Sequence, residues 1–107
     1  MYKQGDIVSI EFPFSDLSER KLRPALVLSN DKYNKHNNLI LAGIYGKKLP
    51  LSLPLTNQAL MYKRLKKDSF ISLQNIFSAE RSLLGKPIDK LTKELLARIL
   101  KEFHDCF

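Results

Sequence analysis

Apolar and polar residues alternate near the start of the chain with the two-residue period of a β-strand. Residues 5–12 follow this pattern, and we expect the side that carries Val8, Ile10 and Phe12 to face the core. The strand should stop at Pro13, because proline has no N–H to donate to a neighbouring strand. Residues 24–29 are almost wholly apolar, which predicts a second strand covered on both faces.

The remaining pattern predicts several more short strands and one terminal helix. Strands are expected at residues 39–45, 51–56 and 69–74, with 76–79 extending or pairing with the last. Polar residues 13–22 should form a long hairpin loop that acts as a lid, and residues 57–67 one or two helical turns. Gly85, Lys86 and Pro87 should break the chain before a helix capped by Thr92 or Asp89, whose apolar face repeats at three- and four-residue spacing: Leu91, Leu95, Leu96, Ile99, Leu100 and Phe103. This order indicates a mainly β (α+β) fold, a small, strongly bent antiparallel sheet or barrel with the helix packed on it.

Size and composition indicate one globular domain. The chain has 107 residues, of which 44% are hydrophobic and 27% charged. A membrane span or signal peptide is not expected, and the single cysteine, Cys106, fits a reducing compartment, so we expect a cytoplasmic protein.

Positive charge is concentrated in the middle of the sequence. The net charge is +7; residues 1–30 and 91–107 are balanced, whereas residues 31–50 carry +3, residues 51–68 another +3 and residues 69–90 the last +1. The basic cluster of Lys63, Arg64, Lys66 and Lys67 gives the second of these segments its charge. Such a surface attracts a polyanion such as RNA, although lysines that only keep a small protein soluble would leave the same signature.

The sequence has few groups suited to catalysis. It contains no Gly-rich phosphate loop, no metal-binding spacing of cysteine and histidine, and only His36 and His104, which we interpret as solvated or structural. Arg23 is the strongest candidate, because Pro24 holds it in extended backbone at the start of an apolar strand. An arginine there can fork across two phosphate oxygens, or it can merely pair with Asp16 or Glu19.

The segment from Gly5 to Asp16 and the run from Arg23 to Asn30 together resemble the MazF/PemK family of type II toxins. The resemblance extends over most of the chain and implies a single toxin domain over residues 1–107 with an SH3-like barrel. It further implies a metal-independent endoribonuclease without a cofactor, a homodimer, single-stranded RNA as substrate and a cognate antitoxin as partner.

The resemblance also implies the site residues. Arg23 occupies the catalytic arginine position, and Tyr45 stands where the family carries a Thr or Ser. Glu19 corresponds to an acidic residue of the same loop, a candidate base or gate. The implied RNA-binding positions are Asp16, Ser18, Arg20, Lys21, Gly46, Lys47 and Gln74.

Tyr45 leaves more than one function open. Its hydroxyl lies several ångströms farther from the backbone than that of a threonine, so it serves as an acid or a stacking group, or it marks lost chemistry. The alternatives are therefore an active endoribonuclease, a toxin-fold protein that only binds RNA or a protein target, as CcdB-like topoisomerase inhibitors do, and a generic SH3-like interaction module.

Overall fold

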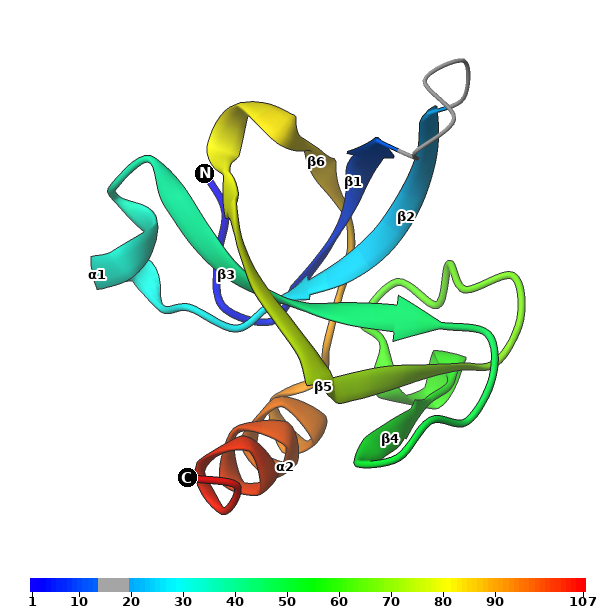
Figure 1. Ribbon diagram of the computed structural model, residues 1–107. Helices are drawn as coiled ribbons and strands as arrows, with labels where there is room; N and C mark the ends of the chain where they lie inside the picture. The colour runs from blue at the N-terminus through cyan, green and yellow to red at the C-terminus, as the bar shows by residue number, and fades with distance from the viewer. Residues whose placement is uncertain (14–19) are drawn as a thin grey trace.

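The computed structural model describes residues 1–13 and 20–107, which form one six-stranded antiparallel sheet with a helix at its C-terminal end (Figure 1). The strands are paired in the order β4-β5-β3-β2-β1-β6. Their bounds are β1 Asp6–Pro13, β2 Arg20–Val27, β3 Asn38–Tyr45, β4 Ser52–Leu55, β5 Ser69–Glu80 and β6 Leu84–Lys90. The helices are α1 Asp31–Asn34 and α2 Lys93–His104, with single 3-10 turns at Asn57–Ala59 (η1) and Arg81–Leu83 (η2). The expected fold class is confirmed.

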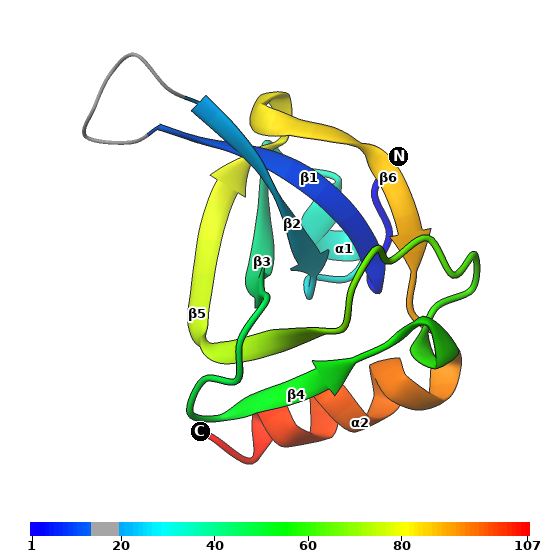
Figure 2. The same cartoon turned by 90° about the vertical axis from the view of Figure 1, so that its right-hand side faces the viewer.

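A bend in β5 gives the sheet its curvature. Ala42 of β3 pairs with Ile76, but Ile44 pairs with Ile71, so β5 has extra residues at 72–75 that β3 does not match. Such a bulge bends and twists a strand. The first part of β5 pairs with β4 and the last part continues along β3 (Figures 1 and 2). The edge strands β4 and β6 do not pair with each other among the described residues, so the sheet is curved but not closed.

Two apolar clusters lie on the two faces of the sheet. One is covered by α2 and includes Ile7, Leu26 and Ile99; the other includes Val8 and Val27. Neighbouring residues of β1 and β2 therefore point into different clusters. The apolar run of β2 is buried as expected. Val8 and Ile10 of β1 are buried as expected, and Ile7 on the other side of the strand is buried as well.

Helix α2 follows its predicted pattern. The hydroxyl of Thr92 accepts the backbone N–H of Leu95 at 3.4 Å, so Thr92 and not Asp89 is the N-cap. Ile99 is fully buried, and the other apolar positions pack on the same cluster: Leu95, Leu96, Leu100 and Phe103. None of the helices in the described ranges is long and apolar enough to span a membrane.

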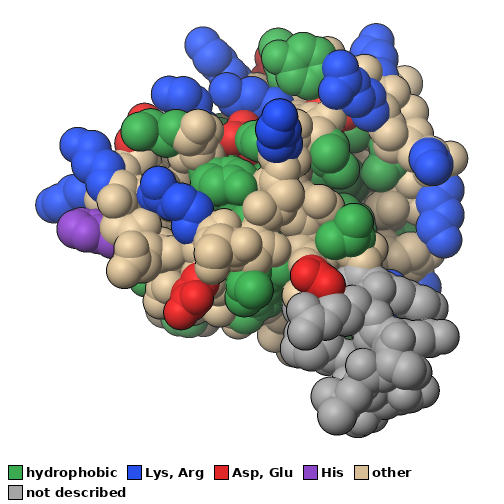
Figure 3. Space-filling view, turned by 90° about the horizontal axis from the view of Figure 1, so that it is seen from above, with side chains coloured by type: hydrophobic (Ala, Val, Ile, Leu, Met, Phe, Trp, Pro, Cys, Tyr) green, Lys and Arg blue, Asp and Glu red, His purple; other side chains and the backbone are tan. Residues whose placement is uncertain are grey.

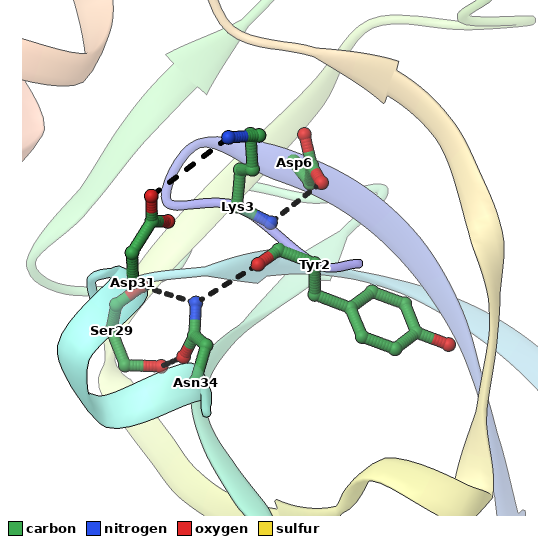
Figure 4. Close-up of polar contacts among 6 residues, drawn as sticks. All are labelled: Tyr2, Lys3, Asp6, Ser29, Asp31 and Asn34. Carbon is green, nitrogen blue, oxygen red and sulfur yellow. Dashed lines mark hydrogen bonds and ion pairs between the residues drawn. The ribbon is translucent and has the colours of Figure 1, made fainter. Parts of the chain in front are cut away.

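Polar contacts attach the N-terminus to α1 (Figure 4). The buried Asn34 side chain accepts the hydroxyl of Ser29 and donates to the backbone carbonyls of Ser29 at 2.9 Å and Tyr2 at 3.4 Å. Lys3 forms an ion pair with Asp31 at 3.8 Å. Because every one of these partners lies before β1 or just after β2, the contacts hold one end of these two inner strands and do not form a reactive site.

Several predicted boundaries differ from the structure. β2 begins at Arg20, so residues 20–22 belong to a strand and not to the expected loop; residues 14–19, where the lid was expected, lie outside the described residues. Residues 76–79 extend β5. Residues 57–67 contain only the short turn η1. The predicted break at residues 85–87 lies inside β6, an edge strand whose pairing with β1 shifts register twice and thereby accommodates Pro87.

Candidate functional site

A cavity of about 330 Å³ lies between β2, the segment after η1, and β6. Its lining is mostly aliphatic and includes Ile44, Leu55 and Leu60. The charged residues of the lining are four cations and one anion: Arg23, Arg64, Lys66, Lys67 and Asp89. Figure 3 shows the molecule from above, where Lys and Arg side chains lie mainly along the upper and side edges of the view and apolar side chains and a few acidic ones lie among them.

Arg23 is exposed and lies where β2 loses one of its two neighbours. It pairs with Ile10 of β1, but the pairing of β2 with β3 starts only at Ala25. Pro24 lies between these two positions, and a proline cannot donate a hydrogen bond to β3. The sequence thus places Arg23 beyond the end of the ladder, open to solvent. Among the described residues no carboxylate forms an ion pair with it.

Tyr45 lies at the end of β3 and is half-buried. Its ring folds back over Gly43, because a Cβ atom on Gly43 would lie 2.7 Å from the Tyr45 hydroxyl oxygen. Gly43 pairs with Ala25, so Arg23 and Tyr45 each lie two residues past the last pair of the β2–β3 ladder. Residues two apart in a strand share a face. Arg23 and Tyr45 therefore emerge on the same face of the sheet. The cavity is lined by Arg23 and by Ile44, the neighbour of Tyr45, whereas Tyr45 is not among its lining residues.

Backbone contacts hold the basic segment after η1 in one shape. The buried carboxylate of Asp89 accepts the backbone N–H groups of Tyr62 and Arg64, both at 2.9 Å. The side chain of Asn57 accepts from the N–H of Leu65 at 2.9 Å and donates to its carbonyl at 3.1 Å. The segment is therefore an ordered part of the site although its charged side chains are exposed.

The same basic segment reaches the end of β3. A Cβ atom on Gly46 would lie 3.0 Å from the ammonium nitrogen of Lys67, so this cation lies directly over the Gly46 backbone. Gly46 was a predicted RNA-binding position, and the contact brings it beside the cavity. Lys47, the next predicted position, is exposed.

The other predicted site residues either do not line the cavity or have side chains that lie outside the described part of the chain. Gln74 is exposed at the bend of β5 and does not line the cavity. Arg20 and Lys21 lie in β2, and their side chains are not described. Three further predicted residues lie outside the described residues altogether: Asp16, Ser18 and Glu19.

Two features of the site could not be assigned from the sequence. The cluster of Arg64, Lys66 and Lys67 was visible as charge, but nothing showed that it faces Arg23. Asp89 was considered only as a helix cap, whereas its carboxylate organises the basic segment. The burial of Asp89 is the signal that could have suggested its role in ordering the basic segment. That burial depends on β6, which the sequence did not predict.

No group of three or more histidine, cysteine, aspartate or glutamate side chains that could hold a metal ion occurs within residues 1–13 and 20–107. Besides the Asp89 carboxylate, the polar side chains that line the cavity are the four cations and the hydroxyls of Ser9 and Ser69. Such an arrangement can bind a phosphate and stabilise negative charge that develops on it.

Comparison with known proteins gives a consistent result. A family model described as PemK-like, MazF-like toxin of type II toxin-antitoxin system matches residues 3–107. A search of curated proteins finds no match.

Solved toxin structures share the fold. A MazE–MazF complex from Deinococcus radiodurans has a TM-score of 0.78 at 17% identity, covering 98% of this chain and 94% of that chain. A mycobacterial endoribonuclease in complex with its cognate antitoxin has a TM-score of 0.76 at 13% identity, covering 98% and 93%. The Mycobacterium tuberculosis toxin MazF-mt6 has a TM-score of 0.68 at 22% identity, covering 94% and 96%.

Proposed function

Because the chain belongs to the PemK-like, MazF-like family of type II toxins, we propose that it is an endoribonuclease that cleaves single-stranded RNA with Arg23 at the reacting phosphate. The observation that carries this proposal is the position of Arg23. It is exposed at the end of the β2–β3 ladder and lines one cavity together with Arg64, Lys66 and Lys67.

The proposed reaction uses the nucleophile that RNA itself contains. The 2′-oxygen attacks the adjacent phosphorus and forms a new P–O bond, while the bond from phosphorus to the 5′-oxygen of the next nucleotide breaks. The products are a 2′,3′-cyclic phosphate and a free 5′-hydroxyl, with the proton from the 2′-hydroxyl balanced by one gained by the leaving oxygen. The guanidinium of Arg23 stabilises the negative charge that develops on the phosphate oxygens.

Tyr45 and Glu19 have proposed roles in the proton transfers. The hydroxyl of Tyr45, on the same face as Arg23, donates to the phosphate or to the leaving oxygen. Glu19 is the proposed base for the 2′-hydroxyl and lies outside the described residues. The remaining cations hold the flanking phosphates in the ground state and the transition state alike.

The proposal includes the partners expected of this family. An acidic antitoxin segment would be attracted to the cations that bind RNA and would block the site. Two solved relatives are complexes with their antitoxins, which supports such a partner here. A cytoplasmic homodimer, with RNA bound between the protomers, completes the proposal.

Replacement of Arg23 tests the catalytic assignment. Arg23→Ala should lower the rate of cleavage of a single-stranded RNA by about 10²–10³-fold, the usual effect of removing one preorganised donor. RNA affinity should fall much less, because the other cations of the cavity remain. Arg23→Lys should restore only part of the rate, since one ammonium group cannot fork across two phosphate oxygens.

Arg98→Ala is the matched control, because Arg98 is an exposed arginine of α2 that does not line the cavity. It should cleave like the wild type. Full cleavage by a folded Arg23→Ala protein would overturn the assignment, and absence of cleavage by the wild type would overturn the proposed reaction.

One observation favours a second candidate function, binding without cleavage. The ring of Tyr45 covers Gly43 at the place where the family carries a small hydroxyl residue. If the ring blocks the reacting phosphate, Tyr45→Thr should raise cleavage above that of the wild type. A loss of cleavage in Tyr45→Thr would instead show that the tyrosine is part of the active site.

A further inference from the structure

We infer that Tyr62 and Arg64 form a stacking platform for one base of the bound RNA, separate from the phosphate contact of Arg23. The inference rests on the proposed function, since it names how the same RNA is held. It concerns the segment between η1 and β5, residues 60–68, to which no contact with RNA was assigned beyond its charge.

The geometry of the pair suits a nucleobase. The guanidinium carbon of Arg64 lies 5.3 Å from the centroid of the Tyr62 ring, so the two groups support each other by a cation–π contact. Tyr62 as a whole residue is 61% exposed. Bases of single-stranded RNA stack on exposed aromatic rings and on guanidinium planes, and here the guanidinium of Arg64 lies over the Tyr62 ring, so the two groups form one stack that a base can extend.

The platform is held in place by hydrogen bonds to its backbone, so the side chains of Tyr62 and Arg64 stay exposed. The Asp89 carboxylate binds the backbone N–H groups of both platform residues, and the N–H of Met61 donates to the carbonyl of Lys90 at 2.8 Å. Lys63, between the two platform residues, has φ of +54°, a left-handed conformation that is unfavourable for a lysine. The surrounding contacts thus maintain a strained turn that displays Tyr62 and Arg64 on the surface.

The platform adjoins the site proposed for cleavage. Arg64 and its neighbours Lys66 and Lys67 line the same cavity as Arg23. An RNA strand that places one phosphate at Arg23 can therefore follow the cations to Tyr62. Since every base has a π-face, the platform should improve affinity for RNA of any sequence and should not select one base strongly.

The test is a binding measurement on defined RNA oligonucleotides, at fixed salt, with the full chain. Tyr62→Ala should weaken binding about 5- to 150-fold, the range for loss of one stacked base. Tyr62→Phe should bind like the wild type, because the ring is retained. Tyr33→Ala is the control, since Tyr33 is also an exposed tyrosine, at 43%, but lies in α1.

A second measurement separates stacking from a purely structural role. A set of oligonucleotides carries one abasic site each, at successive positions. At one position the abasic site should weaken binding to the wild type but cause no further loss of affinity in Tyr62→Ala. This non-additivity identifies the stacked base. The slope of affinity against salt should stay unchanged in Tyr62→Ala, because no phosphate contact is removed.

The platform is overturned if Tyr62→Ala binds like the wild type, if Tyr62→Phe is as weak as Tyr62→Ala, or if no abasic position shows the non-additive effect. Wild-type protein that binds RNA without cleaving it would contradict the proposed cleavage while leaving the platform to be decided by these variants. Wild-type protein that binds no RNA would overturn both.

Discussion

At the residue scale, the most informative contact joins Gly43 and Tyr45. The Tyr45 ring occupies the space in which any side chain at position 43 would stand. A glycine is needed there for reasons of space and not of backbone conformation, because Gly43 has no positive φ. The position and reach of the Tyr45 hydroxyl thus depend on a residue that cannot itself do chemistry.

This contact predicts the effect of Gly43→Ala. The new methyl group would displace the ring, so cleavage should fall by about 10- to 100-fold, the effect of moving a reacting group by about an ångström. Overpacking should lower the free energy of unfolding by ~1–3 kcal/mol. Chemical denaturation and a cleavage assay on the same preparation measure both effects.

The double variant Gly43→Ala with Tyr45→Thr is the control for this prediction. Threonine leaves room for the added methyl group, so the double variant should be more stable than the sum of the two single changes implies. Additive losses of stability would show that Gly43 is required for some reason other than the ring.

The exposed position of Arg23 at the start of the buried part of β2 could be predicted from the sequence because it depends on local residues. Pro24, which follows Arg23, holds Arg23 in extended backbone and ends the pairing of β2 with β3. Both effects depend only on these two adjacent residues. The cavity that Arg23 lines could not be predicted, since its other wall comes from residues 60–69 and from β6, which only the folded sheet brings near β2.

At the scale of elements, the basic segment depends on Asp89 of β6. Asp89→Asn replaces one of its two acceptor oxygens by an N–H donor, so one backbone N–H of the segment loses its acceptor. We expect the free energy of unfolding to fall by ~1–3 kcal/mol, the cost of a buried group left unsatisfied. Hydrogen exchange should show early loss of protection at Tyr62 and Arg64, because their N–H groups bind this carboxylate.

Asp68→Asn is the matched control for the change of charge. Asp68 lies at the end of the same segment and is exposed. The control should leave stability and exchange at Tyr62 and Arg64 unchanged. Equal exchange in the two variants would mean that Asp89 does not order the segment.

The strands also show why some of them could be predicted from the sequence and others could not. The apolar run of β2 predicts a buried strand because both of its faces are covered. β6 was missed because an edge strand with two register shifts tolerates Gly85 and Pro87, which elsewhere end strands. The full length of β5 was uncertain because its alternation is interrupted at the bend, where residues 72–75 do not follow the pairing with β3.

At the scale of the whole molecule, the uneven charge predicts which surface governs binding to RNA. The net charge is +7, but α2 and the residues after it contribute none of the excess. Binding that involves about three phosphates should give a slope near −2 when the logarithm of the association constant is plotted against that of salt concentration. A flat plot would exclude a polyanion as the ligand of this surface.

Two charge-matched triple variants locate the phosphate contacts. Replacing Arg64, Lys66 and Lys67 by alanine removes three cations that line the cavity, and the slope should become clearly shallower. The control replaces three exposed cations of α2, Lys93, Arg98 and Lys101, and changes the net charge equally. Because salt screens charges that are more than about 10 Å from the ligand at 0.1 M, the control should keep the wild-type slope. Equal slopes in the two variants would mean that RNA responds to the net charge of the molecule, and the cavity would then lose its proposed role in holding the strand beside Arg23.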